Sequence, residues 1–564
     1  MSTQARSSEA QERRYRFNRV LFQWCLNRAE QAIKSNCEED AARWLLVAAK
    51  CADTFGCGEL TSPRLESLAL RLATNLPSAA VPPTTTSVTR WLHVMTEAHP
   101  MGGHTALVRR WIANDTSGDI HHLVLTNMEE LSIPELAEAI QSSGGTVTTL
   151  GGIPTYLERA QSLRQLAYAI ADRIVLHIHM WDVVAPIAFG VEGGPPVIYL
   201  NHADHAFWVG SSVADQVANI RQSGVAFCIS YRGITRNALL PIPLECDDSS
   251  ISSNIGARLR DALGIPNDAT VFLTIGTEFK YQAVDGLDFL ASARKLLNVA
   301  PTAYLIAVGL KPTTPGWLEA THELAPRLIT VGKQIDLHPY HAAADVYLEG
   351  FPFGSLTALL EAALANLPCV RAPRAAPPPF TSDGSALDGL AQPDNLDAYI
   401  AEAVSLASSA ESRSKVATTL RFSVRSYHCG DAWRTHLEKF KQALPATHQL
   451  HPVFPKSLPQ EVDRYWGNFL LRCNPQNALE FMLFLASSLN LRPSVDRYLA
   501  LAATRGQIDL YKPHRHPMTW WIFGKLLRDV PIGQLISARA PPKSLLYSFI
   551  EYMFSKHIKW RFKK

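Results

Sequence analysis

The stretch Asp345–Val370, DVYLEGFPFGSLTALLEAALANLPCV, decides the fold of this chain. The apolar run DVYLE predicts a strand, FPFGS predicts a turn, and LTALLEAALA has the apolar spacing of a helix that leads into a second strand. A loop that ends at a helix N-terminus directs free backbone N–H groups and the positive end of the helix dipole toward the space in front of it. The stretch therefore predicts an anion site suited to a diphosphate.

The first turns of this predicted helix carry side chains suited to the same ligand. Ser355 and Thr357 can donate hydrogen bonds to phosphate oxygens or can cap the helix, and the two roles can coexist. Gly354 and Leu356 belong to the same loop and first turn. Glu361 lies further along the helix, where a carboxylate can accept hydrogen bonds from a ribose. Together these residues predict a nucleotide-sugar site.

The bulk composition narrows the class of protein. The chain has 564 residues, too many for one ordinary core, and this length predicts three or four domains. A net charge of +3 argues against a nucleic-acid partner. The N-terminus has no apolar segment after its charges, and no long apolar run occurs, so we expect neither secretion nor a membrane span. Nine scattered cysteines without a CxxC pair predict reduced core thiols in a cytoplasmic protein.

The apolar spacing changes along the chain and predicts four regions. Residues 1–80 have helical spacing and predict an all-helical domain, followed by a linker rich in Pro, Ser and Thr. Residues 89–245 and 246–445 alternate short apolar runs with helical patterns, which predicts βαβ units in each. Residues 446–564 are helical again. The predicted fold class is α/β, with two Rossmann-like lobes facing a cleft and helical regions on both sides.

Three further residues of the second lobe are candidates for donor binding. Lys280 follows the strand VFLTIG, and an ammonium group at a strand end could neutralise a diphosphate leaving group. His338 and His341 lie in the segment KQIDLHPYHAAA, ahead of the motif strand. Their rings could stack on a base, although histidines in a loop with proline are commonly solvated turn residues.

The first lobe repeats the arrangement of strand, glycine-containing loop and helix in RWLHVMTEAHPMGGHTALVRRWI. Gly102 and Gly103 would permit a phosphate or sugar to approach closely, although a turn needs glycine for its geometry alone. His104 follows these glycines and is a candidate catalytic residue.

A polar cluster follows the strand PPVIYLN and contains His202, Asp204 and His205. One of them could be a general base, because histidine titrates near neutral pH and aspartate can do so if burial raises its pKa. The segment HIHMWD places His177 and His179 on one face of a strand, which could suggest a metal. A third ligand is not evident, so we predict a polar strand end and no metal site.

These motifs together resemble the inverting GT-B glycosyltransferases of family 41. That family includes the catalytic half of the nucleocytoplasmic O-GlcNAc transferase and the bacterial cytoplasmic protein N-glycosyltransferases. The resemblance implies a UDP-sugar donor as substrate, no cofactor or metal, and a protein acceptor. It also implies roles for residues of this chain: Lys280 on the diphosphate, Thr357 on a phosphate, Glu361 on the ribose, His338 or His341 on the uracil, and His202 and His205 near donor and acceptor.

Two other enzyme classes stay open. A retaining GT-B transferase that builds polysaccharide or glycolipid would carry two glutamates separated by seven residues, whereas Phe353 stands where the partner of Glu361 would be. The segment HPMGGHT nevertheless looks like the phosphate loop of those enzymes, and it would favour a glycan or lipid acceptor. A sugar-nucleotide epimerase on the same fold is a third hypothesis.

A different class is an inactive transferase-like scaffold that binds partners through its helical ends. Trp520, Trp521 and Phe523, with the tail SKHIKWRFKK, could form an aromatic and basic surface. Such a surface would give a weak contact with an anionic membrane or with a partner protein. Charge clusters at chain ends are more often solvated.

Overall fold

The computed structural model describes residues 3–79, 88–100, 103–246, 253–314, 316–376, 380–456 and Tyr465, with side chains from Asn18 onward. Gly102, nearly all of the predicted C-terminal helical region and the basic tail lie outside the described residues. In the part of the chain that is described, none of the helices combines the length and the apolar character needed to cross a bilayer.

Three helices precede the sheets: α1 (Thr3–Lys34), α2 (Glu38–Phe55) and α3 (Pro63–Thr74). Their apolar faces share one buried cluster with the first lobe, which includes Leu26, Leu45 and Tyr168. The buried Glu66 carboxylate strengthens this junction, because it accepts backbone N–H bonds from Gly210 at 2.7 Å and from Ser212 at 3.0 Å. The helical region is therefore packed onto the first lobe rather than attached only by a linker.

The first lobe contains a seven-stranded parallel sheet in the order β3-β2-β1-β4-β5-β6-β7. Its strands are β1 (Arg90–Met95), β2 (Ile120–Leu125), β3 (Val147–Thr149), β4 (Arg173–His177), β5 (Val197–Asn201), β6 (Gln216–Asn219) and β7 (Asn237–Leu239). Its helices are α4 (Gly103–Asn114), α5 (Pro134–Ser142), α6 (Tyr156–Ile170), α7 (Val184–Ala188) and α8 (Gln222–Phe227), the last followed by the π-helical turn Cys228–Arg232. Parallel strands need such crossovers, and their burial on both faces explains the apolar runs.

The second lobe contains a five-stranded parallel sheet in the order β10-β9-β8-β11-β12. Its strands are β8 (Val271–Ile275), β9 (Tyr304–Val308), β10 (Leu328–Val331), β11 (Val346–Leu348) and β12 (Cys369–Val370). Its helices are α9 (Ser253–Ala262), α10 (Phe289–Val299), α11 (Trp317–Glu323), α12 (His338–Ala343), α13 (Leu356–Leu364) and α14 (Leu396–Ser408). The 3-10 turns are η2 (Glu278–Tyr281) and η3 (Ser385–Leu387).

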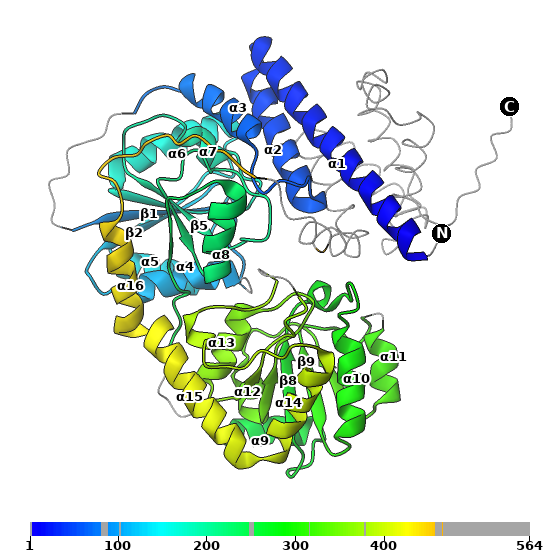
Figure 1. Ribbon diagram of the computed structural model, residues 1–564. Coiled ribbons are helices and arrows are strands. Elements are labelled where there is room, and N and C mark those ends of the chain that lie inside the picture. Colours follow the sequence, from blue (N-terminus) through cyan, green and yellow to red (C-terminus); the bar gives the residue numbers. More distant parts are fainter. Residues whose placement is uncertain are drawn as a thin grey trace, which may run out of the picture.

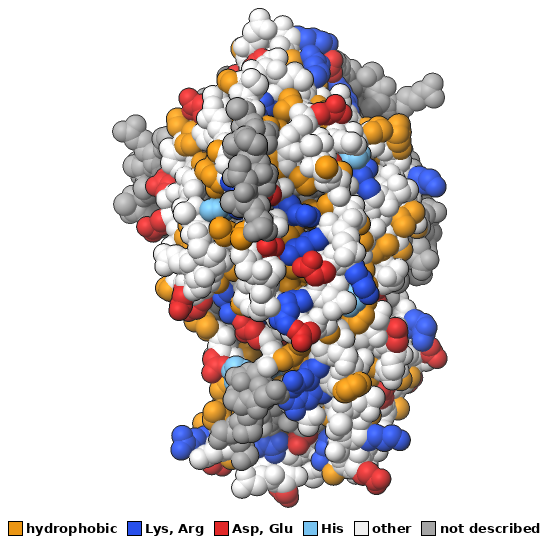
Figure 2. Space-filling view, turned by 90° about the vertical axis from the view of Figure 1, so that its left-hand side faces the viewer, with side chains coloured by type: hydrophobic (Ala, Val, Ile, Leu, Met, Phe, Trp, Pro, Cys, Tyr) orange, Lys and Arg blue, Asp and Glu red, His pale blue; other side chains and the backbone are white. Residues whose placement is uncertain are grey.

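The two sheets form two lobes, with α4 and α8 of the first lobe lying toward α13 of the second (Figure 1). The predicted fold class, α/β with two Rossmann-like lobes, is confirmed. On the face shown in Figure 2, the Lys and Arg side chains lie interspersed with Asp and Glu side chains.

The chain returns to the first lobe through α15 (Ala410–His428) and α16 (Gly430–Gln442). In Figure 1, α16 lies beside the sheet of the first lobe. Trp433 of α16 donates its indole N–H to the carbonyl of Pro241 at 2.8 Å, and Lys441 pairs with Asp119 at 3.0 Å. The boundary predicted at residue 445 would place α16 in the second lobe, whereas its side chains contact the first. The sequence pattern shows that α16 is amphipathic but not which lobe it covers.

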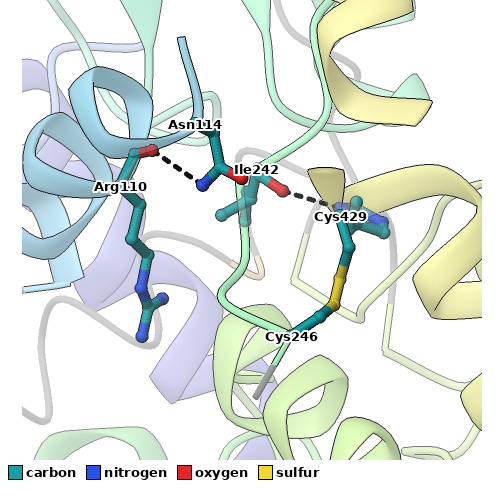
Figure 3. The surroundings of a disulfide bond; sticks show 6 residues. Arg110, Asn114, Ile242, Cys246 and Cys429 are labelled. Atoms are coloured by element: carbon teal, nitrogen blue, oxygen red, sulfur yellow. Dashed lines mark hydrogen bonds between the residues drawn. A yellow bond between two sulfur atoms is a disulfide. The ribbon is translucent and has the colours of Figure 1, made fainter. Parts of the chain in front are cut away.

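A disulfide joins Cys246 to Cys429, where the two segments that cross between the lobes lie side by side (Figure 3). The prediction that the cysteines are reduced thiols is therefore wrong for this pair. The two residues are 183 positions apart in the chain, so their spacing gave no sign of pairing. Six other cysteines of the described residues are free, and all but Cys37 are buried. Cys473 lies outside the described residues.

Candidate active site

The predicted anion site lies at the start of α13. Lys280 comes from η2, just past the carboxyl end of β8, and β8 is the neighbour of β11 in the sheet. Its ammonium donates to the Gly354 carbonyl at 3.1 Å and to the Ser355 hydroxyl at 3.0 Å, and it lies 5.0 Å from the centre of the Phe353 ring. Thr357 lies half-buried in the first turn of the helix. The structure thus brings Lys280 together with the loop, as the sequence predicts.

The electrostatics of this corner favour an anion. Burial and the nearby charge of Arg221 lower the pKa of Lys280 to about 8, although Glu349 acts in the opposite direction. A negatively charged ligand beside the ammonium would reverse that shift. The N-terminal end of α13 adds the positive end of its dipole and free backbone N–H groups.

Glu349 is a buried residue that sequence reasoning missed. Its carboxylate accepts backbone N–H bonds from Ala372 at 2.8 Å and Ser382 at 3.1 Å. A Cβ added to Gly354 would lie only 2.4 Å from Glu349 Oε1, so glycine is required there by packing. The available signal was an acidic residue at the end of an apolar strand, in DVYLEG. Glu349 therefore holds the loop around Ser382 against the anion site.

Asp204 and His205 form a hydrogen-bonded pair at the facing edge of the first lobe. Asp204 is buried and accepts two bonds from the Arg221 guanidinium, at 2.5 and 2.7 Å, while His205 Nδ1 lies 3.4 Å from Asp204 Oδ1. Burial alone would raise the pKa of Asp204, but Arg221 lowers it well below its usual range. The raised pKa that would let Asp204 itself act as a base is therefore absent. Its carboxylate is placed to orient His205 instead.

The His205 ring contacts the second lobe. Its centre lies 4.7 Å from that of Phe353, in an edge-to-face arrangement, and 6.1 Å from that of Phe380. Burial lowers the pKa of His205 although Asp204 acts in the opposite direction. The imidazole is therefore neutral near pH 7 and can accept a proton. His205 and Lys280 therefore contact the same loop, residues 353–355, and they come from opposite lobes.

His104 and His202 form a second group. Their rings are stacked with centres 4.2 Å apart, His104 in the first turn of α4 and His202 just after β5. Burial lowers the pKa of His202 to about 4 and lowers that of His104 well below its usual value. Gly103 is exposed, and a Cβ added there would meet none of the described atoms within 4 Å.

A row of buried histidines lies beneath this second group, and sequence reasoning missed most of it. His93 of β1 bonds His177 of β4 at 2.9 Å and His121 of β2 at 3.0 Å, and His121 lies 3.5 Å from Asp115. The strand order β2-β1-β4 brings the three rings together. His177, considered above as a metal ligand, uses its Nε2 to bond His93, and His179 packs against Trp181 with ring centres 5.3 Å apart.

The residues predicted to contact the nucleobase and the ribose differ in how exposed they are and in which partners they have. His338 is exposed at the start of α12, while His341 is buried in the same helix and burial lowers its pKa to about 4. Glu361 accepts a 2.6 Å bond from Arg110 of α4, in the other lobe. The carboxylate predicted to contact a ribose is thus already engaged across the interface between the lobes.

Comparisons with known proteins assign the second lobe to a class. Residues 269–409 match the profile of a family described as "Glycosyl transferases group 1". A comparison with curated protein sequences finds no match.

A glycosyltransferase from Rickettsia africae is 9% identical, with a TM-score of 0.48 over 64% of this chain and 99% of that one. The Anabaena protein HepE, in complex with UDP and glucose, is 15% identical, with a TM-score of 0.46 over 63% of this chain and 98% of that one. A mutant of the Thermobaculum terrenum O-GlcNAc transferase is 17% identical, with a TM-score of 0.44 over 76% and 84%.

The family match confirms the predicted enzyme class, a glycosyltransferase. Its range contains the whole anion site of the second lobe, including Lys280 and the start of α13. Membership of family 41 in particular stays a prediction.

Proposed function

We propose that the protein transfers a sugar from a UDP-sugar to a protein acceptor, with inversion at the anomeric carbon and without a metal ion or cofactor. The observation that carries this proposal is the placement of two groups on one loop. Lys280 contacts residues 353–355 from the second lobe, and the oriented His205 contacts Phe353 from the first. A base and a leaving-group site thus face each other across a short distance, as transfer to an acceptor requires.

The chemistry assigns a task to each group. An acceptor hydroxyl or amide gives its proton to His205 while its oxygen or nitrogen attacks the anomeric carbon, and the bond from that carbon to the diphosphate breaks. Asp204 stabilises the imidazolium that forms, because it accepts from His205 Nδ1 and keeps its negative charge beside Arg221. Lys280, Thr357 and the N-terminal end of α13 stabilise the charge that develops on the departing UDP.

The remaining donor contacts follow from the same placement. Glu361 would accept from the ribose after exchange with Arg110, and His338 or His341 would lie near the uracil. His104 and His202 would lie on the acceptor side, at the carboxyl edge of the first sheet.

A thermal-shift series with UDP, GDP and TDP tests the donor part of this proposal. Binding to the folded state raises apparent stability, by about 2.7 kcal/mol at a hundredfold excess over Kd, so UDP should raise Tm more than the other two. If none of the nucleotides shifts Tm, the donor assignment fails and the inactive scaffold becomes the better hypothesis.

The anomeric configuration of the product tests the second part. With an α-linked UDP-sugar, proton NMR of the product should show a β linkage. An α linkage would instead support the retaining alternative. The resemblance of HPMGGHT to the phosphate loop of retaining enzymes favours that alternative.

A further inference from the structure

A short loop of the second lobe, residues 380–384, contacts the first-lobe residues that hold His205. The Thr381 carbonyl accepts from Arg221 Nη1 at 3.2 Å. The Asp383 carboxylate accepts from the Ser223 backbone N–H at 2.8 Å and from the Ser223 hydroxyl at 2.7 Å. All of these contacts join one lobe to the other.

The same loop is fixed to the anion site of its own lobe. The Phe380 carbonyl accepts from the Gly354 N–H at 2.7 Å, and Glu349 accepts from the Ser382 N–H at 3.1 Å. Arg371 donates to the Ser382 carbonyl at 2.7 Å. The loop is therefore held against the residues to which the proposed function assigns the donor diphosphate.

Arg221 connects the two sets of contacts. It is buried, and it donates through two nitrogens to Asp204 and through the third to Thr381, with Asp383 3.9 Å away. Asp204 in turn contacts His205. A continuous series of contacts thus runs from Gly354 and Phe380 through Thr381 and Arg221 to the Asp204–His205 pair.

We propose that the 380–384 loop is a positioning element that aligns the Asp204–His205 pair, through Arg221, when the two lobes are together. The inference rests on the proposed role of His205 as the base. An arginine fork shared by a carboxylate and a carbonyl has few alternative orientations, so docking of the loop fixes the guanidinium and with it the carboxylate. The base is then in place only when the lobe that holds the donor is docked, which limits transfer to water.

The variant Asp383→Ala removes both bonds from Ser223 and the second carboxylate near Arg221. Asp388→Ala is the matched control, since Asp388 follows in the same segment and its side chain is exposed. Ser223→Ala changes the first-lobe partner of Asp383 and removes the bond from the hydroxyl while it leaves the bond from the backbone N–H. Near-native circular dichroism and Tm establish that each variant is folded.

The first measurement does not need activity. The rate at which diethylpyrocarbonate modifies His205, followed by mass spectrometry of its peptide, reports how well the ring is held. Without any nucleotide, we expect Asp383→Ala to be modified roughly tenfold faster than the unaltered protein, because hydrogen bonds that hold a charged group are lost. The modification rate of Ser223→Ala should lie between those of Asp383→Ala and the unaltered protein, and the rate of Asp388→Ala should equal that of the unaltered protein.

The second measurement is hydrolysis of UDP-glucose. If the loop positions the base, Asp383→Ala lowers kcat roughly tenfold and leaves KM for UDP-glucose near its original value. Equal His205 reactivity in Asp383→Ala and Asp388→Ala would overturn the inference. A failure of the donor proposal is recognised separately, because UDP would then leave the Tm of the unaltered protein unchanged. The rates at which His205 is modified without nucleotide would still decide the role of the loop.

Discussion

Lys280 holds a half-buried ammonium beside a carbonyl, a hydroxyl and an aromatic ring, and these contacts are all neutral. Burial and the charge of Arg221 lower its pKa to about 8. A lysine kept for a structural ion pair would instead have its pKa raised by a carboxylate partner. The surroundings of Lys280 are thus suited to an anion that arrives and leaves, which is what a diphosphate does in a transfer reaction.

Replacement of Lys280 by methionine should therefore affect turnover more than stability. We expect Lys280→Met to lower kcat by about 10²–10³-fold, the usual effect of removing one electrostatic contact to a developing charge. Initial rates with UDP-sugar and a Tm measurement check this. The control is Lys295→Met, because Lys295 lies at the surface and pairs with Asp397 at 2.6 Å. Near-normal turnover of Lys280→Met would show that Lys280 does not stabilise the departing diphosphate.

At the residue scale, the sequence predicted neighbours that share a strand end and missed partners that come from far along the chain. Lys280 and Ser355 both follow parallel strands, whose carboxyl ends meet at one edge, so their contact could be predicted. Arg221 could not be assigned to Asp204, because any of many arginines could have paired with that carboxylate. The same absence of pairing information left the pKa of Asp204 open, and burial alone pointed in the wrong direction.

At the element scale, three neighbouring strands bury three histidines in one hydrogen-bonded row. Burial lowers the pKa of His93 well below its usual value and lowers that of His177 to about 3. The unfolded chain binds protons on His93 and His177 below about pH 6.5, whereas burial disfavours the charged form of both rings in the folded protein. Their contribution to stability is therefore fully present above about pH 6.5 and is lost as the pH falls.

The variant His177→Gln tests this linkage. For the unaltered protein, the free energy of unfolding should fall between pH 6.5 and pH 4, by about 1.4 kcal/mol per pH unit for each such histidine. His177→Gln should be less stable at pH 7, because the bond to His93 is weakened, but its stability should fall less steeply with pH. Urea unfolding at several pH values measures both effects.

The facing helices α4 and α13 meet through Arg110 and Glu361, and this pair competes with the proposed ribose contact. Arg110→Ala should free the Glu361 carboxylate and lower KM for the donor several-fold, since a partly buried pair of this kind contributes on the order of 1 kcal/mol. Glu361→Ala should raise KM instead. Steady-state kinetics over a range of UDP-sugar concentrations distinguish the two.

Arg109→Ala is the matched control for that comparison. Arg109 precedes Arg110 on the same helix but pairs with Glu245 at 2.6 Å, so its removal should leave KM for the donor unchanged. If Arg110→Ala raises KM, Arg110 helps to bind the donor rather than competing with it.

The types of elements could be predicted more fully than their order in the sheets. Apolar runs such as DRIVLHIH and RWLHVMTE indicated strands, and β4 and β1 occupy them. The order β2-β1-β4 depends on how crossovers pack, which the local pattern does not encode, so the meeting of His121, His93 and His177 could not be predicted. The same limit hid the return of α16 to the first lobe.

At the scale of the whole molecule, the Cys246–Cys429 disulfide joins two segments that connect the lobes, one before α9 and one after α15 (Figure 3). The crossings also share hydrogen bonds, since His428 Nδ1 donates to the Ile242 carbonyl at 2.9 Å and the Leu244 N–H donates to the His428 carbonyl at 2.9 Å. A covalent link here restricts how the lobes separate, because both connections must bend together.

Loss of the Cys246–Cys429 disulfide should destabilise the protein, and a reductant should lower the stability of the unaltered protein by the same amount. Cys429→Ser opens a loop of 183 residues and should lower the free energy of unfolding by about 2–4 kcal/mol, mainly through the entropy regained by the unfolded chain. Dithiothreitol should lower Tm of the unaltered protein to that of Cys429→Ser and should leave the variant unchanged. Cys37→Ser, at an exposed free thiol, should keep both the original Tm and the response to dithiothreitol. Equal Tm values for the unaltered protein with and without reductant, together with two alkylatable thiols at Cys246 and Cys429, would show that the crossings are held by hydrogen bonds and packing alone, as a reducing cytoplasm would require.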